Sequence, residues 1–400
     1  MCAYGSKTHP IEKISGYHPM KEYLAIKNFG PIDDVVIDDI KPFTVFIGES
    51  GCGKSTIMKV LALFRWMYKM VNIRSYLKDY SHVRKSPFRF NFPNYLKNDG
   101  LDGYLKGNSY LKYSRGECQM EYRDGKFRLI SQSIPKSELN LEKNAFISEK
   151  RNLIPDVMDH NLNINKKAFY LNEVWNDYTI SSNTISELQM PFVNVTFKSI
   201  KTKQGEKHYI IPIGGEEYKV ELKAASSGIQ SSTPIAIISE YFHRHYNLVK
   251  SMNLSILSYL SEFDDISQFK SDVSIASFPN KRVNLFIEEP ELSLFPDNQV
   301  ELMDFLMARS LKSANADYDI TLTMSTHSPF VVNYLNVLLL KNENGFNGED
   351  IAAYRIYEGK IQDLRLKDDE GRVVAVDTRD LSETMQSILN AYQELNAEKE

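Results

Sequence analysis

The first part of the chain alternates between the apolar spacing of strands and that of a helix. Residues 23–38, YLAIKNFGPIDDVVID, predict two short strands around a turn, and the apolar run FTVFIG at 43–48 predicts a third strand. Apolar residues then recur at helical spacing from 55 to 71 without a proline, which predicts a helix of about four turns. The glycine-rich stretch IGESGCGKST at 47–56 joins this strand to this helix.

The same two periods return in the second half of the chain. A helix is predicted from residue 227, with Pro234 tolerated only near its first turn or at a kink. The apolar runs VNLFIEEP at 283–290 and ITLTMSTHSPF at 320–330 predict two buried strands. The stretch 72–220 is rich in Tyr, Asn, Lys and Phe and predicts mixed strands and short helices, without the heptads of a coiled-coil arm.

This order of elements predicts an α/β fold with a mixed sheet and flanking helices. We expect one head domain built from residues 22–71 and 221–335. Residues 72–220 are expected to form an inserted mixed α+β lobe, whose aromatic residues make either a core of its own or a sensing or partner surface. Residues 1–21 would be an N-terminal extension and 336–400 a C-terminal mixed segment.

Composition excludes several classes of protein. The 400 residues are 42% hydrophobic and 25% charged, which is ordinary for a soluble globular protein, and the three cysteines are too few for a disulfide framework. The chain has no run of 18 apolar residues and no signal-peptide core, so we expect a cytoplasmic protein with no membrane contact. A net charge of -4 leaves only local clusters for DNA, at 82–85 and 201–203, where solvated loops are the alternative.

The glycine-rich loop predicts a nucleotide site. Its spacing fits G-x-x-x-x-G-K-[ST], in which backbone N–H groups and the start of a helix surround the phosphates. Lys54 would reach the β- and γ-phosphates, Ser55 would bind Mg²⁺, and Cys52 is interpreted as a passive small residue. The candidate ATP-binding residues of this loop are Gly48, Glu49, Ser50, Gly51, Cys52, Gly53, Lys54, Ser55 and Thr56.

Candidate catalytic groups follow the two later strands. Because neighbouring residues of a strand point in different directions, Glu288 can hold Mg²⁺ while Glu289 deprotonates the attacking water. His327, just past the second of these strands, could donate a hydrogen bond to the γ-phosphate or to the water. The stretch AASSGIQSS at 224–232 places small hydroxyl residues and a glycine at a helix start, which is either a second set of phosphate donors or an ordinary cap.

These pieces, in this order, resemble the ABC ATPase superfamily. The strings FTVFIGESGCGKST, ASSGIQSSTP, FIEEPELSLFPDNQ and STHSPF are most similar to soluble OLD-like and RecF-like ATPases, over about residues 22–71 and 222–335. The resemblance implies an ABC-type P-loop NTPase head with ATP and Mg²⁺ as cofactors. It also implies that Ser227, Gly228 and Gln230 form a signature motif, that 292–296 is a D-loop, and that His327 is a switch histidine.

The resemblance is incomplete at several positions. Ile229 stands where many transporters have a second signature glycine, and Ser50 stands where relatives often have Asn. The Q-loop glutamine is not placed, with Gln119 and Gln132 as the two candidates. Residues 146–155, FISEKRNLIP, resemble an IPAER-like segment, which implies that Lys150 and Arg151 contact the active site or a partner.

A composite site of this superfamily needs two heads, so we expect a homodimer or an even-numbered higher oligomer. About 65 residues follow the switch region, too few for the Toprim nuclease that many OLD-like proteins carry, and KDDEGR at 367–372 is expected to be a surface turn. The leading hypothesis is therefore a slow ATPase that acts as sensor and scaffold in anti-phage defence, as in the PARIS and Septu systems, and controls a separate nuclease or toxin. The alternative is a RecF-like DNA clamp in repair, and a transporter ATPase is disfavoured.

Overall fold

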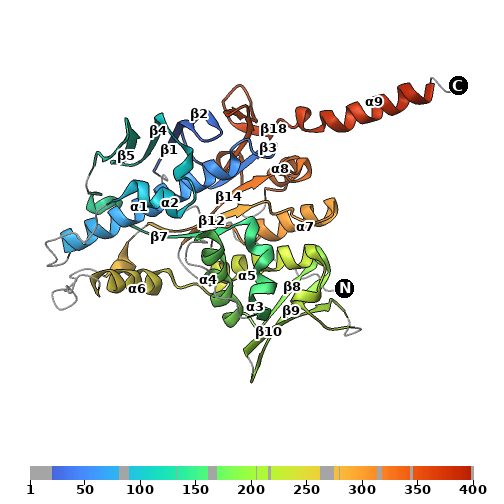
Figure 1. The fold of residues 1–400 in the computed structure, drawn as a ribbon, viewed down its shortest axis with the longest axis horizontal. Coiled ribbons are helices and arrows are strands. Elements are labelled where there is room, and N and C mark those ends of the chain that lie inside the picture. Colours follow the sequence, from blue (N-terminus) through green and yellow to red (C-terminus); the bar gives the residue numbers. More distant parts are fainter. Residues whose placement is uncertain are drawn as a thin grey trace, which may run out of the picture.

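The fold is known from a computed structural model that describes residues 20–80, 90–131, 133–160, 169–203, 205–214, 218–261, 274–278, 280–312, 318–342 and 346–397. Its centre is a 12-stranded sheet with the strand order β6-β5-β4-β1-β2-β16-β15-β3-β14-β12-β7, to which β13 adds beside β14. Figure 1 shows helices packed around this sheet, a smaller sheet at the lower edge, and the last helix standing away from the body. The expected α/β fold with a mixed sheet and flanking helices is confirmed.

Five parallel strands form the functional half of the large sheet. They are β15 (Ile351–Tyr357), β3 (Phe43–Gly48), β14 (Asp319–Thr326), β12 (Asn280–Glu288) and β7 (Asn140–Ile147). Each pairs in parallel with the next, for example Phe43 with Leu322 and Leu285 with Ala145. Because parallel strands end at the same edge of a sheet, the loops after β3, β7, β12 and β14 meet there.

The other half of the sheet is mainly antiparallel. It contains β1 (Glu22–Phe29), β2 (Ile32–Ile37), β4 (Leu105–Arg115), β5 (Cys118–Arg123), β6 (Lys126–Leu129) and β16 (Lys360–Asp363). The predicted strands on both sides of the turn at Gly30 are confirmed as β1 and β2, which pair antiparallel. The short strand β13 (Leu311–Lys312) and the hairpin of β17 (Arg365–Lys367) and β18 (Val373–Val376) complete this region.

The division of the chain differs from the expected one. Residues 72–220 do not form one inserted lobe, because β4, β5 and β6 extend the sheet beside β1 and β7 closes its other edge beside β12. Only β8 (Glu187–Met190), β9 (Val195–Thr202), β10 (Gly205–Pro212) and β11 (Val220–Glu221) form a sheet of their own. The head also continues beyond residue 335, since β15 lies directly beside β3.

The helix that follows the glycine loop is longer than expected. It is α1 (Lys54–Tyr80), which crosses the sheet and packs against β3, β7, β12 and β14. The apolar pattern predicted a helix that is too short, because two buried residues in its second half, Asn72 and Ser75, are polar. Both are hydrogen-bonded inside the protein. Asn72 donates to the Asn140 side chain at 2.8 Å, and the Ser75 hydroxyl accepts the Ile134 N–H at 2.8 Å.

Most of the described aromatic residues of the middle segment are buried or half-buried. The exposed ones among them are Tyr104, Phe169 and Tyr218. Phe92, at the start of α2 (Phe92–Asn98), stacks on Phe64 of α1 and on Phe127 of β6, and Phe64 stacks on Tyr113 of β4. Burial of rings at this interface removes a large apolar area from water and fixes β4 to β6 against α1. The aromatic composition of this part therefore serves the common core of the head.

The remaining helices lie around the sheets. They are α3 (Ile154–His160), α4 (Phe169–Thr184), α5 (Ser227–Arg244), α6 (Leu248–Ser261), α7 (Pro296–Met307), α8 (Pro329–Lys341) and α9 (Glu383–Ala397). The helix predicted from residue 227 is confirmed as α5, and Pro234 lies inside it, beyond the first turn. Within the part of the chain that the structure describes, none of the helices has the length and apolar character needed to cross a membrane.

Candidate nucleotide site

The glycine loop forms a tight cradle between β3 and α1. A Cβ atom at Gly48 would lie 2.3 Å from the Ile356 carbonyl oxygen, and one at Gly53 would lie 2.3 Å from the Ile32 side chain. Gly53 also has a φ of +109°, which L side chains rarely adopt. Glu49, Ser50 and Gly51 lie exposed at the top of the loop, and Thr56 is buried in the first turn of α1.

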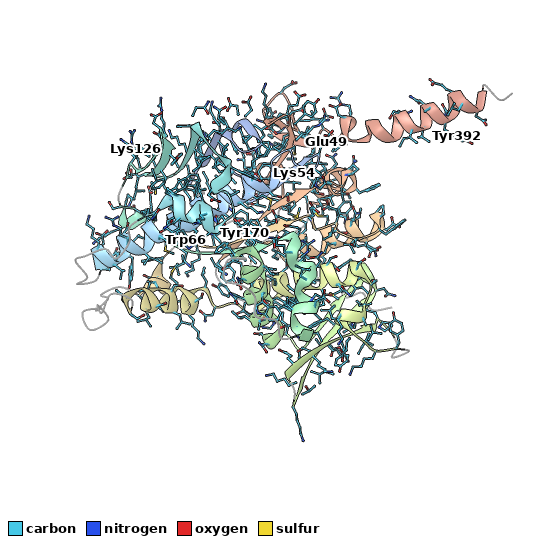
Figure 2. The ribbon with its side chains drawn as sticks, in the orientation of Figure 1. Glu49, Lys54, Trp66, Lys126, Tyr170 and Tyr392 are labelled. Atoms are coloured by element: carbon cyan, nitrogen blue, oxygen red, sulfur yellow. The ribbon has the colours of Figure 1, made fainter. Side chains whose placement is uncertain are left out.

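The Lys54 side chain turns back into this loop. Its ammonium group donates to the carbonyl oxygens of Gly48 and Glu49, both at 2.8 Å, and lies 3.7 Å from the Cys52 sulfur. Lys54 is 5% exposed, and burial lowers the pKa of its ammonium group. Figure 2 shows Glu49 and Lys54 at this turn. A cation held inside a ring of backbone groups is placed to meet the phosphates of a nucleotide.

Glu288 ends β12 in a buried position next to α1. Its side chain is 1% exposed, and among the described residues neither carboxylate oxygen has a hydrogen bond of normal geometry, while the Lys59 ammonium lies 3.8 Å from Oε1. Burial, together with the neighbouring Glu149 carboxyl, raises the pKa of Glu288 to about 8. A buried carboxylate without donors is costly unless a cation completes its surroundings.

The surroundings of Glu288 fit a divalent cation. Ser55, at the start of α1, partly counteracts the rise in the pKa of Glu288, so the hydroxyl and the carboxylate are neighbours at this edge of the sheet. Oxygen ligands of this kind suit Mg²⁺, which usually keeps part of its shell for water and substrate phosphate. No group of three or more His, Cys, Asp or Glu residues able to hold a metal occurs among the described residues.

Glu289 and His327 meet at the open side of the same edge. Their side chains are 3.3 Å apart between Oε1 and Nε2, and each is 33% exposed. Glu289 has a φ of +44°, an uncommon conformation for a residue with a side chain. This turn at the end of β12 directs Glu289 away from the buried position of Glu288, as strand alternation predicted. The Glu291 carboxylate accepts a hydrogen bond from the His327 backbone N–H at 2.6 Å, which holds the backbone of the histidine in position.

Arg151 holds this arrangement together from the short 3-10 helix η3 (Glu149–Leu153). Its guanidinium is fully buried and donates to four backbone carbonyls in three segments. The acceptors are the carbonyls of Ser148 at 3.1 Å, Ser231 at 2.9 Å, Glu288 at 2.6 Å, and Glu289. The sequence resemblance implied the same role, contact with the active site or a partner, for Lys150 and Arg151. In the structure the two differ, because Arg151 is buried at the site and Lys150 is exposed to solvent.

The stretch at 224–232 starts α5 and lies against the loop after β12. A Cβ at Gly228 would come within 2.6 Å of the Ser293 carbonyl oxygen, and the Ser231 hydroxyl donates to the Leu292 carbonyl at 2.7 Å. Ser227 is exposed. The Gln230 amide donates to the carbonyls of Lys223 and Ala225, so it closes the local turn that precedes the helix.

Replacing Gly228 with alanine is expected to displace residues 292–294 by a few tenths of an ångström or more, since the added methyl would overlap a backbone oxygen. We expect a loss of about 1–3 kcal/mol in stability from this overlap. Urea unfolding of Gly228→Ala beside the matched Ser227→Ala variant, whose side chain is exposed, checks this. Equal midpoints for the two variants would contradict the close approach.

Sequence reasoning missed Glu149, although it marked Lys150 and Arg151 in the same segment after β7. Gln119 lies on β5, at the opposite end of the sheet from β12, so it is wrong as a candidate for this site, and Gln132 lies outside the described residues. Instead Glu149, at the carboxyl end of β7, comes beside Glu288. Parallel pairing of β7 with β12 brings the two together, and this pairing has no local sequence signal.

Two further surface predictions concern charged stretches. The stretch 367–372 is a turn between β17 and β18, as expected, in which Asp368 accepts the backbone N–H groups of Glu370 and Arg372. Lys201 of the second basic cluster lies on β9 directly opposite Glu206 of β10 in the strand register. The first cluster, 82–85, lies outside the described residues.

Comparison with known proteins identifies the family to which the chain belongs. The geometry is that of a P-loop ATPase, and residues 20–75 and 124–332 match the model of the AAA ATPase domain family (AAA_15). The chain belongs to this family. None of the curated proteins matches it.

Several solved structures are similar at low identity. The SMC head domain from Thermotoga maritima is 12% identical, with 88% of this chain and 100% of that one covered and a TM-score of 0.32. The Smc head domain with an extended coiled coil, bound to the C-terminal domain of ScpA derived from Pyrococcus furiosus, is 11% identical, with 93% and 100% covered and a TM-score of 0.35. The recombination mediator protein RecF is 12% identical, with 87% and 100% covered and a TM-score of 0.35.

Proposed function

We propose that this chain binds ATP with Mg²⁺ and hydrolyses it slowly between two copies of itself. The observation that carries the proposal is the Glu289–His327 pair, 3.3 Å apart and partly exposed, at the sheet edge that also carries Lys54. An acid–base pair beside a phosphate cradle is what hydrolysis of a phosphoanhydride requires. The buried Glu288 and Ser55 would hold Mg²⁺, which neutralises charge on the phosphates when bound.

In this mechanism Lys54 and the loop N–H groups hold the β- and γ-phosphates. Glu289 accepts a proton from water as the water oxygen bonds to the γ-phosphorus, and the bond from that phosphorus to the bridging oxygen breaks, releasing ADP. His327 holds Glu289 in place or donates a hydrogen bond to the γ-phosphate. Ser227, exposed at the start of α5, and the backbone of the buried Gly228 beside it would meet the γ-phosphate of the second copy.

Two exposed phenylalanines support pairing of the heads at this edge. Phe295, which ends the loop after β12, is 69% exposed, and Phe330, three residues after His327, is 45% exposed. Large aromatic side chains left in water next to a catalytic pair are typical of a surface that a partner covers. A second copy, turned by a two-fold axis, would cover both sites at once.

Phe295→Asp is expected to weaken ATP-dependent dimerisation of the Glu289→Gln protein about 30-fold or more, the loss of about 2 kcal/mol typical of a buried aromatic anchor. The matched control is Leu340→Asp. Leu340 is 85% exposed, but it lies about 15 Å from Phe330 along α8 and therefore away from the proposed interface. Sedimentation with and without ATP measures the dimer, and fluorescent-nucleotide binding verifies the site. Unchanged dimerisation of Phe295→Asp would place the interface elsewhere.

We further propose that the ATPase works as sensor and scaffold in bacterial anti-phage defence, where it controls a separate nuclease or toxin. The resemblance of its P-loop, FIEEPELSLFPDNQ and STHSPF strings to soluble OLD-like ATPases supports this role. Native mass spectrometry of Glu289→Gln, expressed with its neighbouring genes and purified in Mg²⁺ and ATP, tests it. A stable complex with a second protein supports the defence role, whereas a bare dimer that retains DNA would favour a DNA clamp.

A further inference from the structure

The C-terminal helix α9 stands away from the rest of the described chain. Figure 1 shows it projecting from the body beyond β18, and Figure 2 shows Tyr392 on this isolated helix. All residues from 386 to 396 are exposed. Helices of about 12–15 residues are marginal in water without packing, so a 15-residue helix in this position needs a partner surface.

One face of α9 is apolar. Ile388, Leu389, Tyr392 and Leu395 are 59%, 47%, 68% and 61% exposed. The steps from 388 to 392 and from 392 to 395 are four and three residues, the spacing of a coiled-coil seam, and Leu389 widens it on one side. The opposite face is polar, with Gln386 donating to the Asn390 side chain at 3.0 Å.

The lack of charged residues beside this seam is compatible with pairing of two identical helices. The positions that flank the seam of a coiled coil are held here by Leu389, Ala391 and Asn396, none of which is charged. Glu394 lies outside these positions, so two copies of α9 can meet without apposing like charges. A partner with a charged rim would gain no ion pair from α9, whereas an identical helix presents a seam of the same width and polarity.

We propose that α9 pairs with α9 of a second copy of this chain and forms a contact between copies that needs no nucleotide. The contact is independent of the ATP-dependent pairing of the heads, because its residues lie outside the nucleotide site. If both contacts form with different copies, they link head dimers into larger assemblies with an even number of chains.

Cysteine cross-linking of the full chain without nucleotide tests this directly. Tyr392 lies midway between Ile388 and Leu395, so it comes near its own copy in either a parallel or an antiparallel pair. We expect Tyr392→Cys to form a disulfide-linked dimer under mild oxidation, since bonding requires Cα atoms within about 7 Å. Asn390→Cys, on the opposite face, is the matched control and is expected to cross-link at least 10-fold more slowly, and the wild-type chain reports the background from its own cysteines.

A second measurement does not depend on new cysteines. Ile388→Glu with Leu395→Glu is expected to abolish nucleotide-free self-association in sedimentation while leaving ATP-dependent dimerisation and nucleotide binding intact. Equal cross-linking at 390 and 392, cross-linking only with ATP, or unchanged sedimentation of the double variant would overturn the proposal. Because Phe295→Asp affects only the pairing of the heads, failure of either contact is recognised separately.

Discussion

Replacing Glu289 with glutamine is expected to slow ATP hydrolysis by about 10²–10⁴-fold, the usual contribution of a positioned general base. Glutamine keeps the size of the side chain but cannot accept the proton of the attacking water. The left-handed backbone at Glu289 and its contact with His327 place this carboxylate at the open side of the site. Nucleotide binding is expected to persist, because the binding groups lie on the loop between β3 and α1.

Single-turnover hydrolysis and equilibrium binding of a fluorescent nucleotide separate the two effects. Glu301→Gln is the matched control, since Glu301 is exposed on α7 and carries the same chemical change. Lys54→Ala should give the opposite pattern, with binding lost. Hydrolysis by Glu289→Gln at the wild-type rate would assign the base to another group.

Arg151→Met is expected to destabilise the chain more than any other single change considered above. Methionine retains much of the apolar volume but removes a donor from four backbone carbonyls, of which that of Ser148 also accepts the backbone N–H of residue 151. The cost is about 1–3 kcal/mol for each carbonyl that stays buried and unpaired. The total is expected to be on the order of 3 kcal/mol or more. The loop after β12 and the start of α5 should loosen first, because Arg151 joins them.

Chemical denaturation gives the total loss, and hydrogen exchange locates it. The neighbouring exposed Lys150→Met is the matched control and should fall within about 0.5 kcal/mol of the wild type, as surface changes usually do. Faster exchange confined to 288–295 and 227–232 in Arg151→Met would support the role given to this arginine. Uniform exchange across the head, or no loss of stability, would refute it.

The elements with local signals were predictable from the sequence. The glycine loop lies between a strand and a helix, and Glu288 with Glu289 and His327 follow strands that the apolar runs mark clearly. Parallel pairing then brings the ends of these strands together. The meeting of Glu289 and His327 follows from this topology.

The middle of the chain could not be placed from the sequence for a physical reason. Several of its sheet residues are charged and resemble surface positions, yet they form buried pairs. In the middle segment Arg115 pairs with Glu142, and outside it Glu22 pairs with Arg65 at 2.8 Å, with all four at most 2% exposed. Arg65 and Glu142 belong to α1 and β7, so each partner is distant in sequence. Hydrophobic periodicity does not register such pairs, and it does not register the contacts of Arg151 either, to which only the resemblance of residues 146–155 pointed.

The position of β3 bears on how the chain folds. The strand that leads into the glycine loop is flanked by β14 and β15, both made from the last quarter of the sequence. During synthesis β3 therefore lacks both of its neighbouring strands until residues up to 357 have been made. Contacts of such long sequence separation slow folding and leave apolar edges open meanwhile. Truncation before residue 351 would thus remove one wall of the phosphate cradle, including the Ile356 carbonyl that meets Gly48.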